Sequence, residues 1–286
     1  MRVLVTGGNG QLGHDLVRVL SSQHDVIAAG RQDADITNLS AVQSLIADVR
    51  PQCVIHAAAF TEVDRCETEQ DNAFAVNALG ARNVTIAAEK AQAAIVFIST
   101  DYVFDGEKGE AYTEFDTPNP QTAYGRSKLW GERFVREQSS RFFVLRTAWL
   151  YGPTGKNFVR TMLQLAEGRT AVKVVADQRG TPTYTEDLAR QIAGLIGTEQ
   201  YGTYHCTAHG SCSWYDFAVE VFRQAAIDVE VQPVTTAEFP RPARRPRNST
   251  LSNYVLKLEG LDVMPDWRDG LSRFISELRE MGGMPA

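Results

Sequence analysis

Long apolar runs are absent from this sequence of 286 residues. A helix that spans a bilayer needs about 20 consecutive, mostly apolar residues, and no segment reaches that length. The chain also enters a short strand pattern at once, without the apolar stretch and cleavage site of a secretory signal. These features predict a cytoplasmic protein with no membrane partner.

Cysteine and net positive charge are also scarce. The four cysteines form no C-x-x-C pair, so we expect reduced thiols rather than a disulfide framework or a metal cage. Acidic residues (35) outnumber basic ones (29), and the net charge of −6 argues against nucleic acid as a partner. The hydrophobic content of 43% is ordinary for a globular protein, and the length suffices for one large domain or two modest ones.

The first 20 residues carry the most informative pattern. An apolar strand over 3–5 is followed by three glycines spaced G-x-x-G-x-x-G and then by apolar residues at helical spacing. Such glycines permit a tight turn, close approach of backbone to a pyrophosphate and close packing of helix on strand. The helix N-terminus then favours an anion. The predicted cofactor contacts in this turn are Gly7, Gly10, Gln11, Leu12 and Gly13.

The end of the next strand, over 26–29, bears on the choice of dinucleotide. An NAD site places an acidic residue near this point to hold the ribose hydroxyls, but Arg31 stands here. An arginine suits the 2′-phosphate of NADPH, although NADH stays open, and the alternative is a solvated surface arginine. Asp35 and Ile36 follow, and we place them near the adenine.

Strand and helix patterns alternate through most of the chain. Helices are expected over 39–49, 72–91 and 158–166, and strands over 53–57, 94–98, 142–146, 172–175 and 202–206. This rhythm predicts an α/β fold, a Rossmann-like doubly wound parallel sheet with a smaller C-terminal substrate domain. We assign 1–150, continued by about 158–206, to the dinucleotide-binding domain, and 207–286 with the 147–157 loop to the substrate domain. Small residues after the third strand, Ala57, Ala58 and Ala59, would let a flat cofactor lie against backbone.

Two groups of polar residues lie where this fold would bind ligands. Thr100, Asp101 and Tyr102 follow the apolar strand over 94–98, at the sheet edge where doubly wound folds bind ligands. Tyr124 and Lys128 are four residues apart and therefore share a helix face. An ammonium group near a phenol lowers the phenol pKa, and such a tyrosine can pass a proton at neutral pH.

One dense basic segment occurs late in the chain, over 240–247. Prolines restrict its freedom and arginines match phosphate geometry, so we interpret Arg241 and Arg247 as a diphosphate clamp. The alternatives are a solvated loop and an RNA contact.

These motifs resemble the extended short-chain dehydrogenase/reductase superfamily, through the glycine triplet, Ser99-Thr100 and Tyr124-x-x-x-Lys128. A closer resemblance, along almost the whole chain, is to the dTDP-4-dehydrorhamnose reductase family. The segments that carry it are Ala57–Thr61 with Val63-Asp64, Ser99–Phe104, Arg146-Thr147-x-Trp149-x-Tyr151, Asn157-Phe158, Asp177-Gln178-x-Gly180-x-Pro182-Thr183, Ser213–Tyr215 and Arg245-Pro246-x-Asn248-Ser249.

The resemblance implies the last reduction of dTDP-rhamnose synthesis, in which a hydride moves from a nicotinamide to the C4 carbonyl of a dTDP-sugar. It implies that Tyr124 protonates the resulting oxygen and that Lys128 holds the nicotinamide ribose. Thr100 would hydrogen-bond the C4 oxygen. The remaining substrate contacts that it implies are Asp101, Tyr102, Trp149 (as a platform for the sugar, or else a core tryptophan), Asn157, Arg241 and Arg247.

Three alternatives share this scaffold. A nucleotide-sugar dehydratase needs two carboxylates after the threonine, whereas Asp101-Tyr102 supplies only one. An epimerase would keep its cofactor bound and reoxidise it, and a non-catalytic regulatory subunit of the methionine adenosyltransferase type would not need Thr100, Tyr124 and Lys128 together. Some family members are thought to dimerise around magnesium held by glutamates, one of them at the position of Asp15. Because Asp15 is a shorter carboxylate we predict no metal site, while a magnesium requirement and a homodimer stay open.

Overall fold

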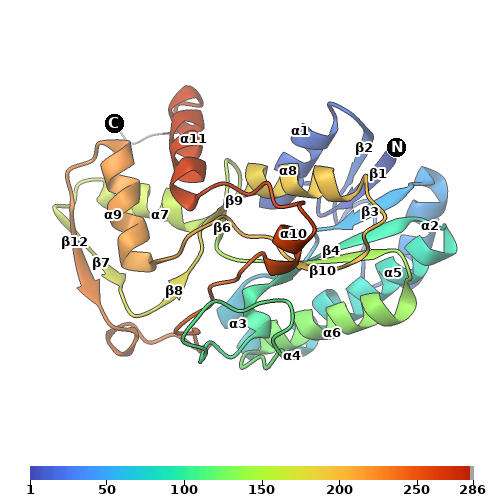
Figure 1. The fold of residues 1–286 in the computed structure, drawn as a ribbon, viewed down its shortest axis with the longest axis horizontal. Coiled ribbons are helices and arrows are strands. Elements are labelled where there is room, and N and C mark those ends of the chain that lie inside the picture. Colours follow the sequence, from blue (N-terminus) through green and yellow to red (C-terminus); the bar gives the residue numbers. More distant parts are fainter. Residues whose placement is uncertain (284–286) are drawn as a thin grey trace.

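The computed structural model describes residues 1–283, and its centre is a parallel sheet of six strands (Figure 1). The strands are β1 (Arg2–Thr6), β2 (Asp25–Ala29), β3 (Cys53–His56), β4 (Ala94–Thr100), β5 (Phe142–Thr147) and β10 (Gly202–His205). Their order across the sheet is β10-β5-β4-β3-β1-β2. The winding direction therefore changes between β1 and β3, which is where a doubly wound sheet binds its ligand. The predicted α/β class and doubly wound sheet are confirmed.

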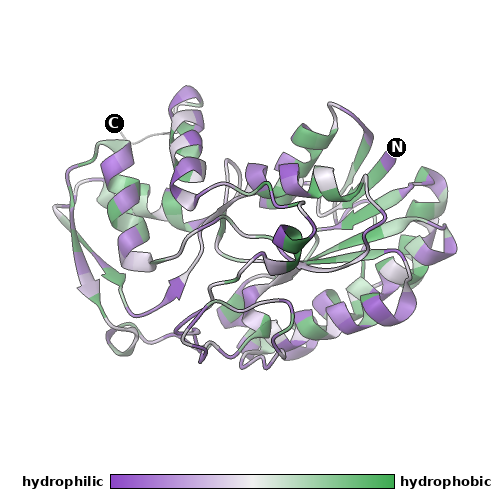
Figure 2. Ribbon diagram, in the orientation of Figure 1, coloured by the Kyte–Doolittle hydropathy of each residue, from purple (hydrophilic) through white to green (hydrophobic). Residues whose placement is uncertain are grey.

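Helices cover both faces of this sheet, which explains why its strands are almost continuously apolar. They are α1 (Gln11–Leu20) and α8 (Thr185–Leu195) on one face and α2 (Leu39–Val49), α5 (Ala81–Lys90) and α6 (Ala123–Gln138) on the other. Neighbouring residues of β1 show the alternation, since Val3 and Val5 pack with α1 while Leu4 packs with α2 and α5. Figure 2 shows the hydrophobic colour gathered in these strands and on the inner sides of the helices.

The connection from β3 to β4 differs from the single helix predicted over 72–91. It consists of α3 (Val63–Thr68), α4 (Gln70–Phe74), a π-helical turn η1 (Ala75–Gly80) and α5. In this turn Asn77 is buried and exchanges hydrogen bonds with the backbone of Phe60 at 2.8 and 3.0 Å. The helix predicted over 72–91 thus ends close to the observed end of α5 at Lys90, but α3 and the π turn were not predicted.

A smaller lobe lies beside the carboxyl ends of the strands (Figure 1). Its helices are α7 (Phe158–Ala166), α9 (Trp214–Ala225) and α11 (Trp267–Glu280), with the 3₁₀ turn η3 (Thr236–Glu238). Its paired strands are β7 (Ala171–Val175) with β12 (Glu230–Val234), β8 (Arg179–Gly180) with β11 (Cys212–Ser213) and β6 (Leu150–Tyr151) with β9 (Thr183–Tyr184). The short helix α10 (Tyr254–Leu258) packs instead on β10 of the central sheet. Aromatic residues dominate the core of the smaller lobe, among them Tyr151, Phe217 and Phe274.

The proposed domain boundary needs one adjustment. Within the predicted continuation over 158–206, only α8 and β10 belong with the central sheet. The helix α7 and the strand β7 pack against α9, and β7 pairs with β12 rather than with the sheet. We therefore propose that 158–184 belongs to the smaller lobe.

Two further expectations concern the chain as a whole. Over residues 1–283, none of the helices combines the length and the apolar character that a membrane crossing requires. All four cysteines are free and buried.

Candidate active site

The glycine turn after β1 is packed so closely that side chains would not fit. Gly7 has φ +73°, and a Cβ there would lie 2.6 Å from the backbone nitrogen of Ala58. A Cβ on Gly13 would lie 2.1 Å from the carbonyl oxygen of Gly7. The turn thus approaches the end of β3 directly, and α1 begins at Gln11 with its free N–H groups facing this point.

A cavity of about 750 Å³ opens where the sheet changes its winding direction. The predicted cofactor contacts that line it are Gly7, Gly10, Arg31, Asp35, Ile36, Ala57, Ala58 and Ala59. Five other predicted cofactor contacts do not line it, namely Gln11, Leu12, Gly13, Tyr124 and Lys128. Leu12 packs into the core with α8, and Gly13 packs against the backbone of Gly7 and Gly8. Further polar residues of the wall were not predicted, namely Asn9, Gln32, Thr37, Glu62, Arg65 and Asn72.

Arg31 and Asp35 occupy the outer end of this cavity. The side chain of Arg31 is 90% exposed and lies 3.8 Å from the Asp35 carboxylate. The backbone and hydroxyl of Thr37 donate hydrogen bonds to Asp35 and hold its pKa below the usual value. Arg31 is thus free to reorient toward an anion, whereas Asp35 is fixed by its own turn.

The candidate catalytic residues meet where β4 ends. Thr100 is the last residue of β4, and its hydroxyl donates to the carboxylate of Asp101 at 2.9 Å. Tyr102 follows in the 3₁₀ turn η2 (Asp101–Val103), and its ring meets that of Tyr124 edge-on at 5.6 Å between centroids. Thr122 caps α6 by accepting a hydrogen bond from the backbone of Gly125, which fixes Tyr124 in the first turn of that helix.

The electrostatics of the tyrosine and lysine differ from the expected pattern. Burial raises the pKa of Tyr124 well above its usual value, and the Thr100 hydroxyl only partly offsets that shift. Lys128 is not among the groups that shift the Tyr124 pKa, so the expected lowering of the phenol pKa by Lys128 is not found in the protein alone. Burial also lowers the pKa of Lys128 to about 7, although the Glu132 carboxylate favours the charged form. The Lys128 Nζ lies 4.1 Å above the ring centroid of Phe97.

A buried ion pair between Glu132 and Arg146 fixes the helix that carries Tyr124 and Lys128. Glu132, one helical turn beyond Lys128, accepts hydrogen bonds from Arg146 at 2.9 and 2.8 Å and from the Ser99 hydroxyl at 2.6 Å. Both partners are buried, with side-chain exposures of 0% and 2%. Glu132 thereby joins α6 to the ends of β4 and β5. Asn77 adds a second tie, since its amide donates to Ser127 of the same helix at 3.0 Å.

The aromatic platform is arranged differently from the expected one. Trp149 has φ +48°, in the left-handed region, and its ring stacks on Trp214 at 3.4 Å between centroids. Gly180 lies so close to Trp149 that an added Cβ would be 2.4 Å from the indole. Because Trp214 occupies one face of the ring, only the remaining surface of Trp149 can meet a sugar.

The side chain of Asn157 makes hydrogen bonds within the protein that hold α7 and the start of α1 in place. Its carbonyl oxygen caps α7 by accepting from Arg160, and its amide donates to Gly152 at 2.9 Å and to Gln11 at 3.2 Å. Both amide hydrogens are used, so the side chain links the smaller lobe to the glycine turn. A direct contact with substrate stays a prediction that requires one of these bonds to open.

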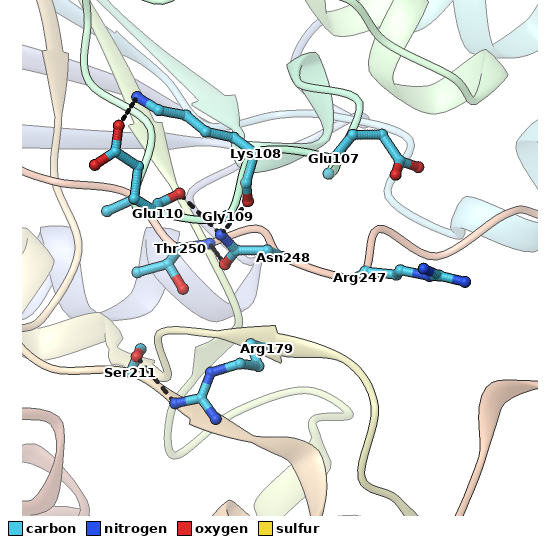
Figure 3. Close-up of a pocket in the computed structure, with 11 residues that line it drawn as sticks. Glu107, Lys108, Gly109, Glu110, Arg179, Ser211, Arg247, Asn248 and Thr250 are labelled. Atoms are coloured by element: carbon cyan, nitrogen blue, oxygen red, sulfur yellow. Dashed lines mark hydrogen bonds and ion pairs between the residues drawn. The ribbon is translucent and has the colours of Figure 1, made fainter.

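The two arginines of the expected clamp, Arg241 and Arg247, contact different residues. Arg247 lines a second cavity, of about 440 Å³, together with Arg179 and Ser211 (Figure 3). Figure 3 shows Arg179 pointing toward Ser211, to which it donates a hydrogen bond at 3.4 Å, while Arg247 extends in another direction. Arg241 does not line this cavity, and its guanidinium packs 4.8 Å above the ring of Phe239. The diphosphate clamp of Arg241 and Arg247 therefore stays a prediction.

The residue considered as a magnesium ligand, Asp15, forms an ion pair with an arginine. Asp15 is fully buried, accepts a hydrogen bond from Thr185 and lies 2.8 Å from Arg18. Arg18 also approaches Glu186 at 2.9 Å and Glu277 at 3.8 Å. Within residues 1–283, no group of three histidine, cysteine or acidic side chains is arranged to hold a metal ion.

Comparisons with known proteins agree with this architecture. A family model for the RmlD substrate binding domain matches residues 1–280. A dTDP-4-dehydrorhamnose reductase of Aggregatibacter actinomycetemcomitans is 41% identical, over 94% of this chain and 97% of that protein. Crystal structures of such reductases are also similar. The reductase from Clostridium acetobutylicum has a TM-score of 0.96 and 50% identity, and the match covers 98% of this chain and 100% of that chain. The reductase from Bacillus anthracis, in complex with NADP, has a TM-score of 0.95 and 47% identity, and the match covers 96% of this chain and 99% of that chain. This chain belongs to the dTDP-4-dehydrorhamnose reductase family.

Proposed function

We propose that the chain is an NADPH-dependent oxidoreductase that reduces the C4 keto group of dTDP-4-dehydro-L-rhamnose to give dTDP-L-rhamnose. The strongest support is the contact of Thr100 with Tyr124 at the end of β4, with Lys128 one helical turn further along α6. Phe60 packs against the cluster that contains Tyr124 and also lines the cavity that the glycine turn bounds. Its relatives carry this activity in their names, and one of them binds NADP. The partner is thus a dTDP-sugar, while a homodimer stays a prediction.

The residues of the larger cavity fit a dinucleotide. A Cβ added at Gly10 would meet only the carbonyl oxygen of Gly7, at 3.1 Å, and Gly10 lines the cavity, so the turn leaves room for a pyrophosphate at the start of α1. Arg31 would meet a 2′-phosphate, and Ala57–Ala59 would lie along the flat part of the cofactor. Lys128 does not line this cavity and would reach the nicotinamide ribose from α6. When bound, NADPH supplies the hydride for the reduction.

The chain's own residues then handle the carbonyl oxygen. Tyr124 donates its phenolic proton to that oxygen, and the raised phenol pKa keeps Tyr124 protonated at neutral pH until charge develops on the substrate. Thr100 directs a hydrogen bond at the same oxygen. With a pKa near 7, Lys128 carries its charge in part of the molecules, and an anion nearby would raise that fraction.

The test of this function is steady-state turnover of dTDP-4-dehydrorhamnose with NADPH, beside the UDP-linked analogue. We expect turnover of the dTDP-linked sugar, with the choice of base decided by the ratio of the two kcat/KM values. Absence of turnover with both sugars, while NADPH binds, would favour the regulatory subunit and contradict the proposed reduction.

Arg31→Ala is expected to lower kcat/KM for NADPH about tenfold or more, and to leave kcat/KM for NADH within twofold. A hydrogen bond to a charged group contributes about 1.5–3 kcal/mol, and about 1.4 kcal/mol corresponds to tenfold. Initial rates with both cofactors measure the ratio. Arg223→Ala, which removes an exposed arginine paired with Glu220 on α9, is the control. Equal losses with both cofactors would show that Arg31 does not contact the 2′-phosphate.

A further inference from the structure

The hydroxyl of Thr100 has one hydrogen, and that hydrogen is already in use. Its oxygen accepts a hydrogen bond from the backbone N–H of Tyr102 at 3.2 Å and lies 2.9 Å from Oδ1 of Asp101. An ionised carboxylate can only accept, so the hydroxyl must donate to Asp101. While Asp101 is ionised, Thr100 therefore cannot also donate to a substrate oxygen.

The surroundings of Asp101 disfavour its charge. The residue is 3% exposed, and its Oδ2 has no hydrogen-bond partner within residues 1–283. Burial raises the pKa of Asp101 to about 6, although the hydroxyls of Ser249 and Thr100 and nearby backbone groups favour the anion. The Ser249 hydroxyl itself donates to the Arg179 carbonyl oxygen, at 3.4 Å.

Within residues 1–283, no cation pairs with Asp101 to offset this burial. From η2 and α6 the groups that face Asp101 are the two phenols Tyr102 and Tyr124, whose pKa values the carboxylate raises. The cation that acts on Tyr102 is Arg245, which pairs with Asp64 of α3 at 3.0 Å. No ion pair to Asp101 exists in the described part of the chain. The carboxyl group thus has the setting of a group that can take up a proton near neutral pH.

We propose that Asp101 is a positioning residue that carries a proton during turnover and so turns the Thr100 hydroxyl toward the C4 oxygen of the substrate. This inference rests on the proposed function. Once protonated on Oδ1, Asp101 donates to the Thr100 oxygen, and the Thr100 hydrogen becomes free to point at the substrate. Tyr124 remains the group that transfers a proton to the substrate, and Asp101 keeps its own proton through the reaction.

The direction of the pH dependence follows from this arrangement. The protonated form of Asp101 is the active one, and kcat/KM reports groups of the free enzyme. As pH rises from 6 to 8, that form falls from about half of the molecules to about one in a hundred, for a pKa of about 6. Loss of one donor to a developing oxyanion costs about 10²–10³ in rate, so the decline is expected to reach at least tenfold before it levels.

The test compares the pH profile of kcat/KM for wild type and Asp101→Asn between pH 5.5 and 8.5, with NADPH and dTDP-4-dehydrorhamnose. We expect the wild type to lose at least tenfold more activity than the Asn variant between pH 6 and 8, because the amide cannot ionise while any loss of charge on Lys128 is common to both proteins. Thr100→Val, which removes the hydroxyl, should lower activity and also flatten this decline. Asp64→Asn, which removes the neighbouring carboxylate, should keep the wild-type shape.

A second measurement does not depend on turnover. Carbon-13 NMR of the aspartate carboxyls in the cofactor-free protein should show one group with a midpoint near pH 6 that disappears in Asp101→Asn. Wild-type turnover with a parallel profile for Asp101→Asn, or an Asp101 midpoint near its ordinary value, would overturn the inference. Failure of the wild type to turn over at any pH would instead contradict the proposed function, and the NMR titration would still report on Asp101.

Discussion

Tyr124→Phe is expected to lower kcat by about 10²–10⁴, which is the usual contribution of a positioned general acid. The variant removes only the phenolic oxygen. The ring contacts with Tyr102 and Ala73 should be kept, because they do not involve that oxygen. Since the hydroxyl gives the proton that completes the reduction, we expect KM for the sugar to change much less than kcat. Initial rates of NADPH oxidation measure both constants.

The control for this loss is Tyr204→Phe, which removes another buried phenol, on a strand separated from β4 by β5. Tyr204 lies on the edge strand β10, and its hydroxyl donates to the Gln200 carbonyl oxygen at 2.6 Å. We expect this variant to keep kcat within twofold, so that any loss in Tyr124→Phe reports chemistry. A Tyr124→Phe protein that retains a third or more of the wild-type kcat would remove Tyr124 from the role of proton donor.

Glu132→Gln is expected to lower the free energy of unfolding by about 3–5 kcal/mol, because it leaves Arg146 charged and buried without its partner. Burial alone would raise the pKa of Glu132, but Arg146 outweighs burial and holds that pKa below its usual value. The folded protein therefore contains the ionised pair at neutral pH. Urea unfolding at pH 7, with the slope of the transition checked for constancy, measures the change.

Replacement of both charges distinguishes a charge effect from a packing effect. Glu132→Leu combined with Arg146→Met removes the pair together, and we expect this double variant to lose less stability than Glu132→Gln alone. Glu220→Gln, which breaks the more exposed pair with Arg223, should change stability by less than about 1 kcal/mol. Equal losses of unfolding free energy in Glu132→Gln and Glu220→Gln would show that the buried pair contributes no more to stability than the exposed one.

The parts of the fold that the sequence predicts well are those with a local period and a local stop. The helix over 39–49 ends just before Pro51, and the helix over 158–166 begins after the cap Asn157, and both agree with the structure. The π turn in η1 has no such pattern, since Asn77 selects it by binding Phe60, 17 residues away in the chain. The pairing of β7 with β12 also depends on distant residues, so a short apolar strand did not reveal which sheet it joins.

The sequence predicts which residues form the candidate site better than it predicts their pKa values. Spacing alone places Tyr124 and Lys128 on one helix face and Thr100 at a strand end. It does not reveal that burial governs the pKa of both Tyr124 and Lys128, because burial depends on the whole fold. The stacking of Trp149 on Trp214 likewise joins residues 65 positions apart, and no local pattern indicates it.

The most direct test of the central claim is the stoichiometry of the reaction with dTDP-4-dehydrorhamnose and NADPH deuterated at the nicotinamide C4. The account predicts one NADPH oxidised for each sugar reduced, with the deuterium found at C4 of the product. A sugar that changes configuration without net oxidation of the cofactor would indicate an epimerase, and bound cofactor without any turnover would indicate a regulatory subunit. Either result would contradict the account.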